Sequence, residues 1–361
     1  MAFSYKEKVS NPIDSHTLMN MIPLLVALSF LTCLVAAPVV RSLAIRNGLF
    51  DLPGDLKIHT APIPRLGGLA MMLGITAAIA VSPPSIRPNP TAITVFCGIW
   101  LLGLIDDLLG TPAVLRLAAH LIAGGALWFA GWRLEFSSVP VFDLVISALF
   151  FAFVINSMNL VDGMDGLGLT IAGTAAMGFV VLFAHGPLSS GFALSCAVFS
   201  VCTAMFIYNF PPATIFMGDS GSTLLGAVLA YLCMDWIRIA PVEHRNLVPL
   251  AFLVLPLSDA VAAIVRRIRG KGSPLEGDRR HFYDLLRQRG WDVQQILAAS
   301  FFASAAFALL SLLSLKDSID PFAVVITIFV LIGLSLFLLG SLDPRGPSAD
   351  SQAVVIARKS I

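Results

Sequence analysis

The amino-acid sequence predicts an all-α integral membrane protein, a polytopic bundle of about eleven (ten to eleven) transmembrane helices. Hydrophobic residues make up 57% of its 361 residues, and charged residues make up 12%. Soluble domains carry about 25% charged residues, so this low charged fraction favours a chain embedded in lipid. Apolar stretches of about 20 residues, the length that spans a bilayer as a helix, recur along the chain with short connections between them.

The apolar stretches give eleven candidate spans. They are 22–44, 66–82, 92–106, 113–131, 140–156, 168–185, 191–209, 215–234, 247–266, 295–314 and 322–341. Several are short and rich in Gly, so a count of ten stays open. We expect one polytopic domain over residues 22–341, with an N-terminal tail of residues 1–21 and a C-terminal tail of residues 342–361.

The first span has a signal peptide as its alternative interpretation. The run IPLLVALSFLTCLVAA has an apolar core followed by small residues, as a cleaved signal peptide does. Lys6 and Lys8 lie too far upstream of this run, however, and the apolar stretch continues to about Ile45. We therefore expect the first span to be retained.

The distribution of basic residues predicts the orientation. With eleven spans, the connections after odd-numbered spans share one side of the membrane with the C-terminal tail. That side holds sixteen of the 23 Lys and Arg residues, and the opposite side holds seven. Basic residues concentrate on the cytoplasmic side of membrane proteins. We therefore expect the N-terminus outside and the more basic side in the cytoplasm.

The polar motifs of the chain all fall on this predicted cytoplasmic side. They are DLPGDLKIH (51–59), IDDLLG (105–110), NSMNLVDGMDG (156–166), FMGDSGS (216–222) and DRRHFYD (278–284). A single site built from distant segments requires such a shared side. These segments are therefore the candidates for the chemistry.

Asp106 and Asp107 form an acidic pair at the end of the third span. An Asp at the centre of a membrane helix costs about 2.5–3.5 kcal/mol on insertion scales, and less near the interface. Because adjacent residues on a helix point about 100° apart, the two carboxylates cannot simply face one solvent pocket. The alternative is that both are interfacial acids that cap the fourth span, which begins near Thr111-Pro112.

The stretch NSMNLVDGMDGLG (156–168) places four oxygen-bearing side chains directly after an apolar run. Asp162 and Asp165 are three residues apart, as are Asn156 and Asn159. A Gly follows each Asp, which indicates a turn where the backbone approaches a ligand closely. Asn and Asp oxygens suit Mg²⁺, and the spacing excludes an EF-hand. An ordinary glycine-rich turn between two spans is the alternative.

Asp219 opens the eighth span in the motif MGDSGS. The small residues around it leave backbone N–H groups at a helix start, which form a natural cradle for phosphate. An ordinary N-cap is the alternative. Five carboxylates gathered on one face would repel one another unless a cation lies among them. Mg²⁺, with Mn²⁺ as the alternative, acting on a phosphorylated substrate explains this arrangement.

Two cationic candidates complete the predicted site. Lys57 lies in a Pro-rich loop, where its alternative role is only that of a topology signal. His281 lies in DRRHFYDLLRQRG (278–290), which predicts a short amphipathic helix with Asp278 as its N-cap and Gly290 just beyond its end. Binding of anionic lipid headgroups is the alternative role of this basic segment.

The remaining polar and sulfur-containing residues are assigned no chemistry. Asp259, deep in the ninth span, is expected to pair within the bundle or to shape the site. The five Cys residues lie in apolar runs without metal-ligand spacing, which predicts packed free thiols. They are Cys33, Cys97, Cys196, Cys202 and Cys233. The net charge of +1 predicts no nucleic-acid partner.

Taken in order, DLPGDLKIHTAPIPRLGG, DDLLG, NSMNLVDGMDGLG, FMGDSGSTLLG and the late His loop resemble the motifs of the polyprenyl-phosphate N-acetylhexosamine-1-phosphate transferases, glycosyltransferase family 4. The resemblance covers about residues 45–290. It implies an Mg²⁺-dependent enzyme of the bacterial inner membrane whose site faces the cytoplasm. Such an enzyme transfers N-acetylhexosamine 1-phosphate, here expected to be GlcNAc 1-phosphate, from a UDP-sugar to polyprenyl (undecaprenyl) phosphate. UMP is released, and the product starts a lipid-linked surface glycan such as O-antigen.

The resemblance also implies a role for each site residue. Asp106 and Asp107 match the catalytic acidic pair, in which one acid deprotonates or positions the lipid phosphate. Asp219 matches the metal-binding Asp, with Asn159 or Asn156 as a further oxygen ligand. The positions implied to bind substrate are Lys57 for a phosphate, Asn156, Asp162 and Asp165 for the nucleotide and sugar, and His281 for the sugar or diphosphate.

Two departures from the family pattern leave the sugar open. Many relatives carry three His in the last loop, whereas here the run is His281-Phe282-Tyr283-Asp284. Whether Tyr283 or Asp284 replaces a missing His stays open. The first loop commonly reads Arg-Lys, and here it reads Leu56-Lys57. Both departures weaken the alternative of the peptidoglycan translocase, while N-acetylfucosamine and N-acetylquinovosamine remain alternatives to GlcNAc.

Two other classes of protein stay open as alternatives. The CDP-alcohol phosphatidyltransferases also use a double Asp-Gly motif, but the Arg expected after it is missing here. A transporter would also hold acids in the membrane, but near the midplane and in repeat-related helices. The sequence does not define the oligomeric state, and a homodimer stays open.

Overall fold

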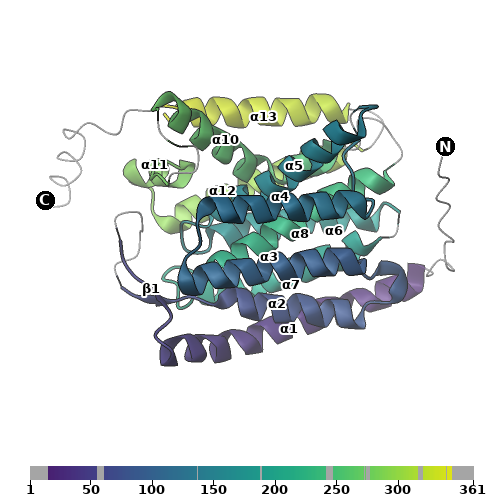
Figure 1. Ribbon diagram of the computed structural model, residues 1–361, viewed down its shortest axis with the longest axis horizontal. Helices are drawn as coiled ribbons and strands as arrows, with labels where there is room; N and C mark the ends of the chain where they lie inside the picture. Colours follow the sequence, from purple (N-terminus) through teal and green to yellow (C-terminus); the bar gives the residue numbers. More distant parts are fainter. Residues whose placement is uncertain are drawn as a thin grey trace, which may run out of the picture.

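The structure is a computed structural model, and it describes residues 15–343 except 55–60, 136, 188, 241–246, 272, 274–276, 316–319 and 339. Long helices run side by side through the molecule (Figure 1). In chain order the elements are α1 (Ser15–Arg46), β1 (Phe50–Asp51), β2 (Ile63–Pro64), α2 (Gly67–Val81), a 3₁₀ turn (Pro84–Ile86), α3 (Pro90–Leu109), α4 (Ala113–Phe129), α5 (Pro140–Val161), α6 (Leu167–Ala184), α7 (Ser190–Asn209), α8 (Gly218–Ile239), α9 (Val248–Phe252), α10 (Val254–Arg269), α11 (Phe282–Gln288), α12 (Val293–Leu313) and α13 (Pro321–Leu338).

The described helices confirm a polytopic helical membrane protein. Seven of them, α1, α3, α5, α6, α7, α8 and α12, are long and apolar enough to cross a membrane. Helices α2 and α4 and residues Phe322–Leu338 of α13 are shorter but also apolar. The structure therefore supports a multi-span bundle, without supporting eleven continuous spans.

The predicted span 247–266 is divided in two. Helix α9 ends at Phe252, and α10 begins at Val254. Pro256 explains the break, because it has no N–H to donate to the carbonyl of Phe252 and its ring clashes with that carbonyl. Helix α10 is also amphipathic and ends in a basic turn. The prediction of one continuous apolar span here is wrong.

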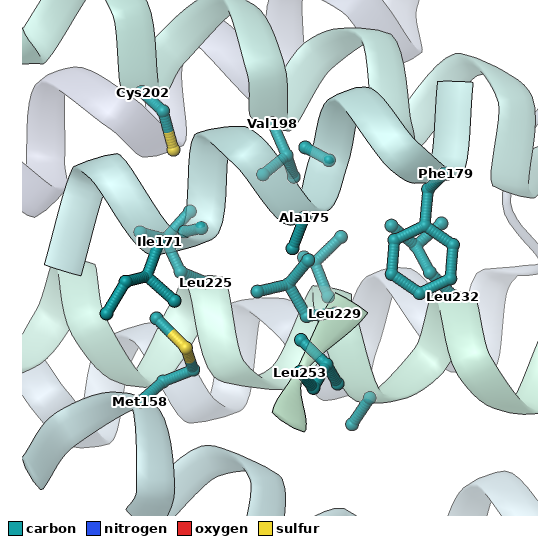
Figure 2. Close-up of a cluster of buried hydrophobic side chains, with 14 of the residues drawn as sticks. Met158, Ile171, Ala175, Phe179, Val198, Cys202, Leu225, Leu229, Leu232 and Leu253 are labelled. Carbon is teal, nitrogen blue, oxygen red and sulfur yellow. The ribbon is translucent and has the colours of Figure 1, made fainter. Parts of the chain in front are cut away.

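Helix α8 is the centre of the bundle. Each of its residues from Ser220 to Trp236 is buried, and Figure 2 shows Leu225, Leu229 and Leu232 of α8 packed with side chains of α5, α6 and α7. A helix that is apolar on all sides is buried by its neighbours. The N-terminal end of α8 is therefore held in place by most of the molecule.

Two glycines bring neighbouring helices into close contact with α8. A Cβ on Gly103 of α3 would lie 2.6 Å from the Cα of Ser220, and a Cβ on Gly226 would lie 2.6 Å from the Cα of Ile155 on α5. Small residues at such positions let membrane helices approach at the backbone. The end of α3, the end of α5 and the beginning of α8 consequently meet at one end of the bundle.

A short hairpin lies over this end of the bundle. Strands β1 and β2 pair in antiparallel register, with Phe50 opposite Pro64 and Asp51 opposite Ile63. Figure 1 shows β1 and α11 at the same end of the bundle. The described parts of the polar motifs, which are far apart in the sequence, are thus gathered at this end.

The described Cys residues are free thiols, as predicted, but one of them is not packed inside the protein. Cys33, Cys196, Cys202 and Cys233 are buried, whereas Cys97 is exposed. Cys97 lies one helical turn before Leu101, which is 49% exposed on the same outward face of α3. The prediction that all five thiols are packed is therefore wrong for this position.

Candidate active site

The polar end of the bundle contains a pocket of about 350 Å³. Five of the described residues that line it are Asp, and one is Arg. The lining residues are Asp51, Arg65, Asp107, Asn159, Asp162, Gly163, Met164, Asp165, Asn209, Phe216, Met217, Gly218 and Asp219. The pocket therefore brings together four of the predicted acids, Asp107, Asp162, Asp165 and Asp219, with Asn159.

Asp107 holds the beginning of α8. Its carboxylate accepts hydrogen bonds from the backbone N–H groups of Asp219 (2.9 Å) and Ser220 (3.0 Å) and from Ser220 Oγ (2.7 Å). Gly218 has a φ of 70°, and a Cβ there would lie 2.6 Å from the Asp107 oxygens. The prediction that these N–H groups cradle a phosphate is wrong for Asp219 and Ser220, because Asp107 already satisfies them.

Asp219 is held from two other helices. Its Oδ1 accepts a hydrogen bond from Asn159 Nδ2 at 2.6 Å, and its Oδ2 lies 3.3 Å from Arg116 Nη1. Asn159 Nδ2 also lies 3.0 Å from Ser222 Oγ. The Asp219 side chain remains 35% exposed. It therefore faces the pocket while α4 and α5 fix its orientation.

Asp106 does not line the pocket, although its carboxylate lies close enough to that of Asp219 to interact with it. Its Oδ1 accepts hydrogen bonds from the N–H (2.5 Å) and Oγ1 (2.7 Å) of Thr111, and its Oδ2 pairs with Arg116. The acidic pair thus diverges, as the geometry of adjacent helical residues predicts. Asp106 ties the start of α4 to the end of α3, so the capping alternative describes part of what Asp106 does. Through Arg116 it also reaches Asp219.

Asp162 and Asp165 lie in a turn between α5 and α6, as predicted from the glycines beside them. Gly166 has a φ of 74°, a backbone conformation that favours glycine. Asp165 Oδ2 accepts a hydrogen bond from the N–H of Ala213 at 2.9 Å, so one of its oxygens anchors the loop before α8. Burial, together with the charges of nearby carboxylates, raises the pKa of Asp162 well above its ordinary value.

Asn156 does not line the pocket. It lies about one helical turn before Asn159 on α5, where its Nδ2 donates to the carbonyl of Ala152 at 2.7 Å and lies 3.2 Å from His120 Nδ1. Of the two Asn residues predicted as alternative metal ligands, the structure brings only Asn159 to the pocket. The side chain of Asn156 is directed toward His120 on α4, so its predicted contact with substrate stays a prediction.

His281 is buried beside the pocket rather than in its wall. Its Nδ1 lies 2.5 Å from Asp259 Oδ2, and its ring stacks on Tyr283 with ring centroids 5.6 Å apart. The Tyr283 hydroxyl donates to the carbonyl of Leu160 at 3.3 Å, and a Cβ on Gly163 would lie 2.0 Å from it. The late loop therefore packs directly on the turn that carries Asp162. Asp259 pairs within the bundle, as expected.

The short helix α11 begins differently from the prediction. His281 is its N-cap residue, and Asp278 instead forms ion pairs with Arg266 (2.7 Å) and Arg267 (3.2 Å). Asp278 is drawn away from the cap because two guanidinium groups compete for its carboxylate. Gly290 lies just beyond the helix end with a φ of 92°, as predicted.

Lys57 lies outside the described residues, so its predicted contact with a phosphate stays a prediction. Two arginines that count in the sequence only toward the predicted orientation are close to the acids. Arg116 bridges Asp106 and Asp219, and Arg65 lines the pocket 3.6 Å from Asp51. Arg116 could have been found as the one Lys or Arg within the apolar stretch 113–131.

The donors around the pocket suit a hard divalent cation. Carboxylate and amide oxygens of Asp162, Asp219 and Asn159 lie at one cavity, and such oxygens are the ligands that Mg²⁺ prefers. Within the part of the chain that the structure describes, no three His, Cys, Asp or Glu side chains are grouped to hold a metal by themselves. Mg²⁺ usually takes one or two carboxylates and completes its shell with water and substrate phosphates. The donor set therefore fits a cation shared with a phosphorylated substrate.

The Asp259–His281 pair predicts a pH-dependent contribution to stability. Burial alone would lower the pKa of His281, but the charges of Asp259, Asp278 and Asp284 outweigh it and hold that pKa above its ordinary value. The protonated pair therefore stabilises the fold fully below about pH 6.5, and this contribution is lost as the pH rises through the raised pKa of His281. Asp259→Asn is expected to lower the free energy of unfolding by about 1 kcal/mol more at pH 6 than at pH 9.

Thermal unfolding of the purified protein in detergent at the two pH values measures this difference. Asp292→Asn is a matched control, because Asp292 caps α12 through Gln295 N at 2.7 Å and has no His partner among the described residues. Its effect is expected to be the same at pH 6 and pH 9. An equal loss at both pH values in Asp259→Asn would contradict the charged pair.

The fold and the pocket together define a class: a multi-span helical membrane protein with an acid-lined pocket that α3, α5 and α8 build at one end of the bundle. The chain belongs to glycosyl transferase family 4. The model of that family matches residues 90–237, which carry Asp107, Asn159, Asp162 and Asp219. The family match confirms the resemblance of the motifs to this family. Neither the family model nor the relatives described below support the alternative classes of phosphatidyltransferase and transporter.

Three relatives illustrate the similarity. The chain is 30% identical over 333 residues, 88% of its length and 91% of the relative's, to a probable undecaprenyl-phosphate N-acetylglucosaminyl 1-phosphate transferase of Bacillus subtilis (strain 168). It is 30% identical over 298 residues, 70% of its length and 71% of the relative's, to a decaprenyl-phosphate N-acetylglucosaminephosphotransferase of Mycolicibacterium smegmatis. An undecaprenyl-phosphate alpha-N-acetylglucosaminyl 1-phosphate transferase of Escherichia coli (strain K12) is 27% identical over 319 residues, 83% of this chain and 85% of that protein. The chain is thus similar to phospho-sugar transferases along most of its length.

Proposed function

We propose that this protein transfers GlcNAc 1-phosphate from UDP-GlcNAc to a polyprenyl phosphate and releases UMP. The single observation that carries the proposal is the gathering of Asp107, Asn159, Asp162 and Asp219 around one pocket. The names of the three relatives support the sugar and the lipid. The product would start a lipid-linked surface glycan such as O-antigen.

The reaction exchanges one phosphoanhydride for another. An oxygen of the lipid phosphate attacks the β-phosphorus of UDP-GlcNAc, the new P–O bond forms, and the bond to UMP breaks with its electron pair leaving on UMP. Catalysis of such a transfer comes mainly from positioning and from neutralisation of charge. Because the bonds formed and broken are of the same type, we expect the reaction to be readily reversible.

Mg²⁺, when bound, would supply part of the neutralising charge. Asp219 and Asn159 would hold it, with Asp162 beside them; rotation of the Asn159 amide by 180° would present its oxygen in place of the NH₂ group that now faces Asp219. Asp107 would fix the position of Asp219 through the start of α8. Asp106 would act on the site through Arg116, which lies between Asp106 and Asp219.

The protein would work in the bacterial cytoplasmic membrane with the pocket facing the cytoplasm and the N-terminus outside. The excess of Lys and Arg on the pocket's side of the membrane supports this orientation. In this orientation the pocket would open to the compartment that contains the nucleotide sugars. N-acetylfucosamine or N-acetylquinovosamine in place of GlcNAc remains the alternative sugar within the same chemistry.

A donor panel with the purified protein tests the proposal. UDP-GlcNAc, UDP-N-acetylfucosamine and UDP-N-acetylquinovosamine are each incubated with polyprenyl phosphate and Mg²⁺, and the lipid product is identified by its mass. UDP-GlcNAc is expected to give polyprenyl-diphospho-GlcNAc and UMP in equal amounts. Product from another donor alone would overturn the sugar assignment, and absence of a lipid-linked product with every donor would overturn the reaction.

A further inference from the structure

The acidic pocket lacks enough positive charge for the substrates that the proposed function brings to it. Five of its described lining residues are Asp, and the one Lys or Arg among them is Arg65. Both a nucleotide diphosphate and a lipid monophosphate are anions, and carboxylates repel them. Arg116 lies nearby, but it is engaged with Asp106 and Asp219 and does not line the pocket. Arg65 is therefore the described cation that faces the space where phosphate would bind.

The backbone of Arg65 is fixed against the segment that leads into α8. Arg65 N donates to Leu49 O at 3.2 Å, Phe216 N donates to Pro64 O at 2.9 Å, and Gly67 N donates to Phe216 O at 2.9 Å. Arg65 and Phe216 form a parallel β-bridge. The side chain of Arg65 thus projects from a rigid position next to the residues that precede Asp219, as a binding residue requires.

The guanidinium of Arg65 has capacity to bind a ligand. Its side chain is 32% exposed and forms an ion pair with Asp51 at 3.6 Å, which is longer than a hydrogen bond; its charge also attracts that of Asp107 across the pocket. A guanidinium carries five N–H donors arranged to bind two oxygens of a phosphate at once. An incoming phosphate would therefore gain short charge-assisted hydrogen bonds in exchange for one long contact.

We propose that Arg65 binds a phosphate group of the substrate in the pocket, by turning from Asp51 toward the incoming anion. The proposal rests on the proposed function and deepens it, because it names a phosphate-binding residue outside the matched region 90–237. The phosphate belongs either to the nucleotide sugar or to the lipid. Their common chemistry is a tetrahedral oxyanion that a planar guanidinium binds through two oxygens.

Direct binding measurements on the purified full-length protein in detergent, with Mg²⁺ present, test the proposal. UDP-GlcNAc and polyprenyl phosphate are titrated separately against the wild type, Arg65→Ala and Arg65→Lys. Arg46→Ala is the matched control, because Arg46 is an exposed Arg at the end of α1 and does not line the pocket. Arg65→Ala is expected to weaken binding of one of the two substrates about tenfold and to leave the other within about twofold.

The substrate that is weakened identifies the source of the phosphate. Arg65→Lys keeps the charge but not the planar fork, so it is expected to recover part of the lost affinity. Binding of both substrates within twofold of wild type in Arg65→Ala overturns the proposal. Equal weakening of both substrates without recovery in Arg65→Lys, or the same weakening in Arg46→Ala, overturns it as well.

Together with the donor panel described above, these binding measurements separate this proposal from the proposed function. A wild-type protein that binds both substrates but transfers nothing contradicts the reaction and leaves the effect of Arg65→Ala on affinity as the test of phosphate binding. A wild-type protein that binds neither substrate overturns both.

Discussion

Replacement of Asp219 by asparagine is expected to reduce transfer by about three orders of magnitude, since the charge that faces the pocket is lost. Asn has nearly the same size, so the contact with Asn159 can be kept while the attraction to Arg116 and to a divalent cation disappears. Release of UMP from UDP-GlcNAc in the presence of polyprenyl phosphate measures the effect. The fold is expected to persist, because α8 is buried along nearly its whole length.

Asp320→Asn is the matched control for this prediction. Asp320 is an exposed residue before α13, where its carboxylate accepts a hydrogen bond from the N–H of Phe322 at 3.0 Å. Its replacement is expected to leave transfer unchanged. If Asp219→Asn is inserted normally and retains more than about a tenth of wild-type transfer, Asp219 is not the central charged group of the pocket.

Asp107→Asn is expected to reduce both transfer and stability. The Asp107 carboxylate accepts three hydrogen bonds from Asp219 and Ser220 at the start of α8, and an amide would turn an NH₂ group toward one of these donors. A buried N–H left without an acceptor costs about 1–3 kcal/mol, and the displaced helix start would misplace Asp219. We therefore expect a loss of transfer of about 100-fold or more, together with a lower unfolding temperature.

Ser220→Ala separates the two effects of Asp107. It removes the hydroxyl bond to Asp107 but keeps both backbone hydrogen bonds. Its losses of transfer and of unfolding temperature are expected to be clearly smaller than those of Asp107→Asn. Comparable losses in the two variants would mean that the hydroxyl, rather than the backbone of α8, is what Asp107 holds.

The helical membrane fold could be predicted from the sequence because each long apolar run must be a helix that satisfies its own backbone in lipid. The interruption at Leu253 could not be predicted from hydropathy, which averages over a window. Pro256 causes the interruption, because it removes the helical hydrogen bond to the carbonyl of Phe252, four residues earlier. The exposure of Cys97 was missed for a similar reason, since apolar composition does not tell the lipid-facing side of a helix from the buried side.

The acids of the pocket could be predicted because each lies at a helix end, and the helix ends concerned meet at the same end of the bundle. Their partners could not, because contacts such as that of Asp107 with Asp219 depend on which faces of two distant helices meet. Asn156 and Asn159 show the same limit: both lie on α5 in one motif, yet only Asn159 reaches the pocket. Arg65 could not be predicted as a site residue, because a loop arginine before a Gly pair carries no chemical pattern of its own.

The bond between Asp107 and the start of α8 joins residues 112 positions apart. During synthesis α3 is made and inserted long before α8. Asp107 therefore has no α8 backbone to bind until α8 has been made. Asp219 then joins the acids already inserted, and its orientation is set as it arrives. The acid-lined pocket is thus complete only when the chain has been made through α8, and a nascent or truncated chain that ends before this point carries an incomplete set of its acids.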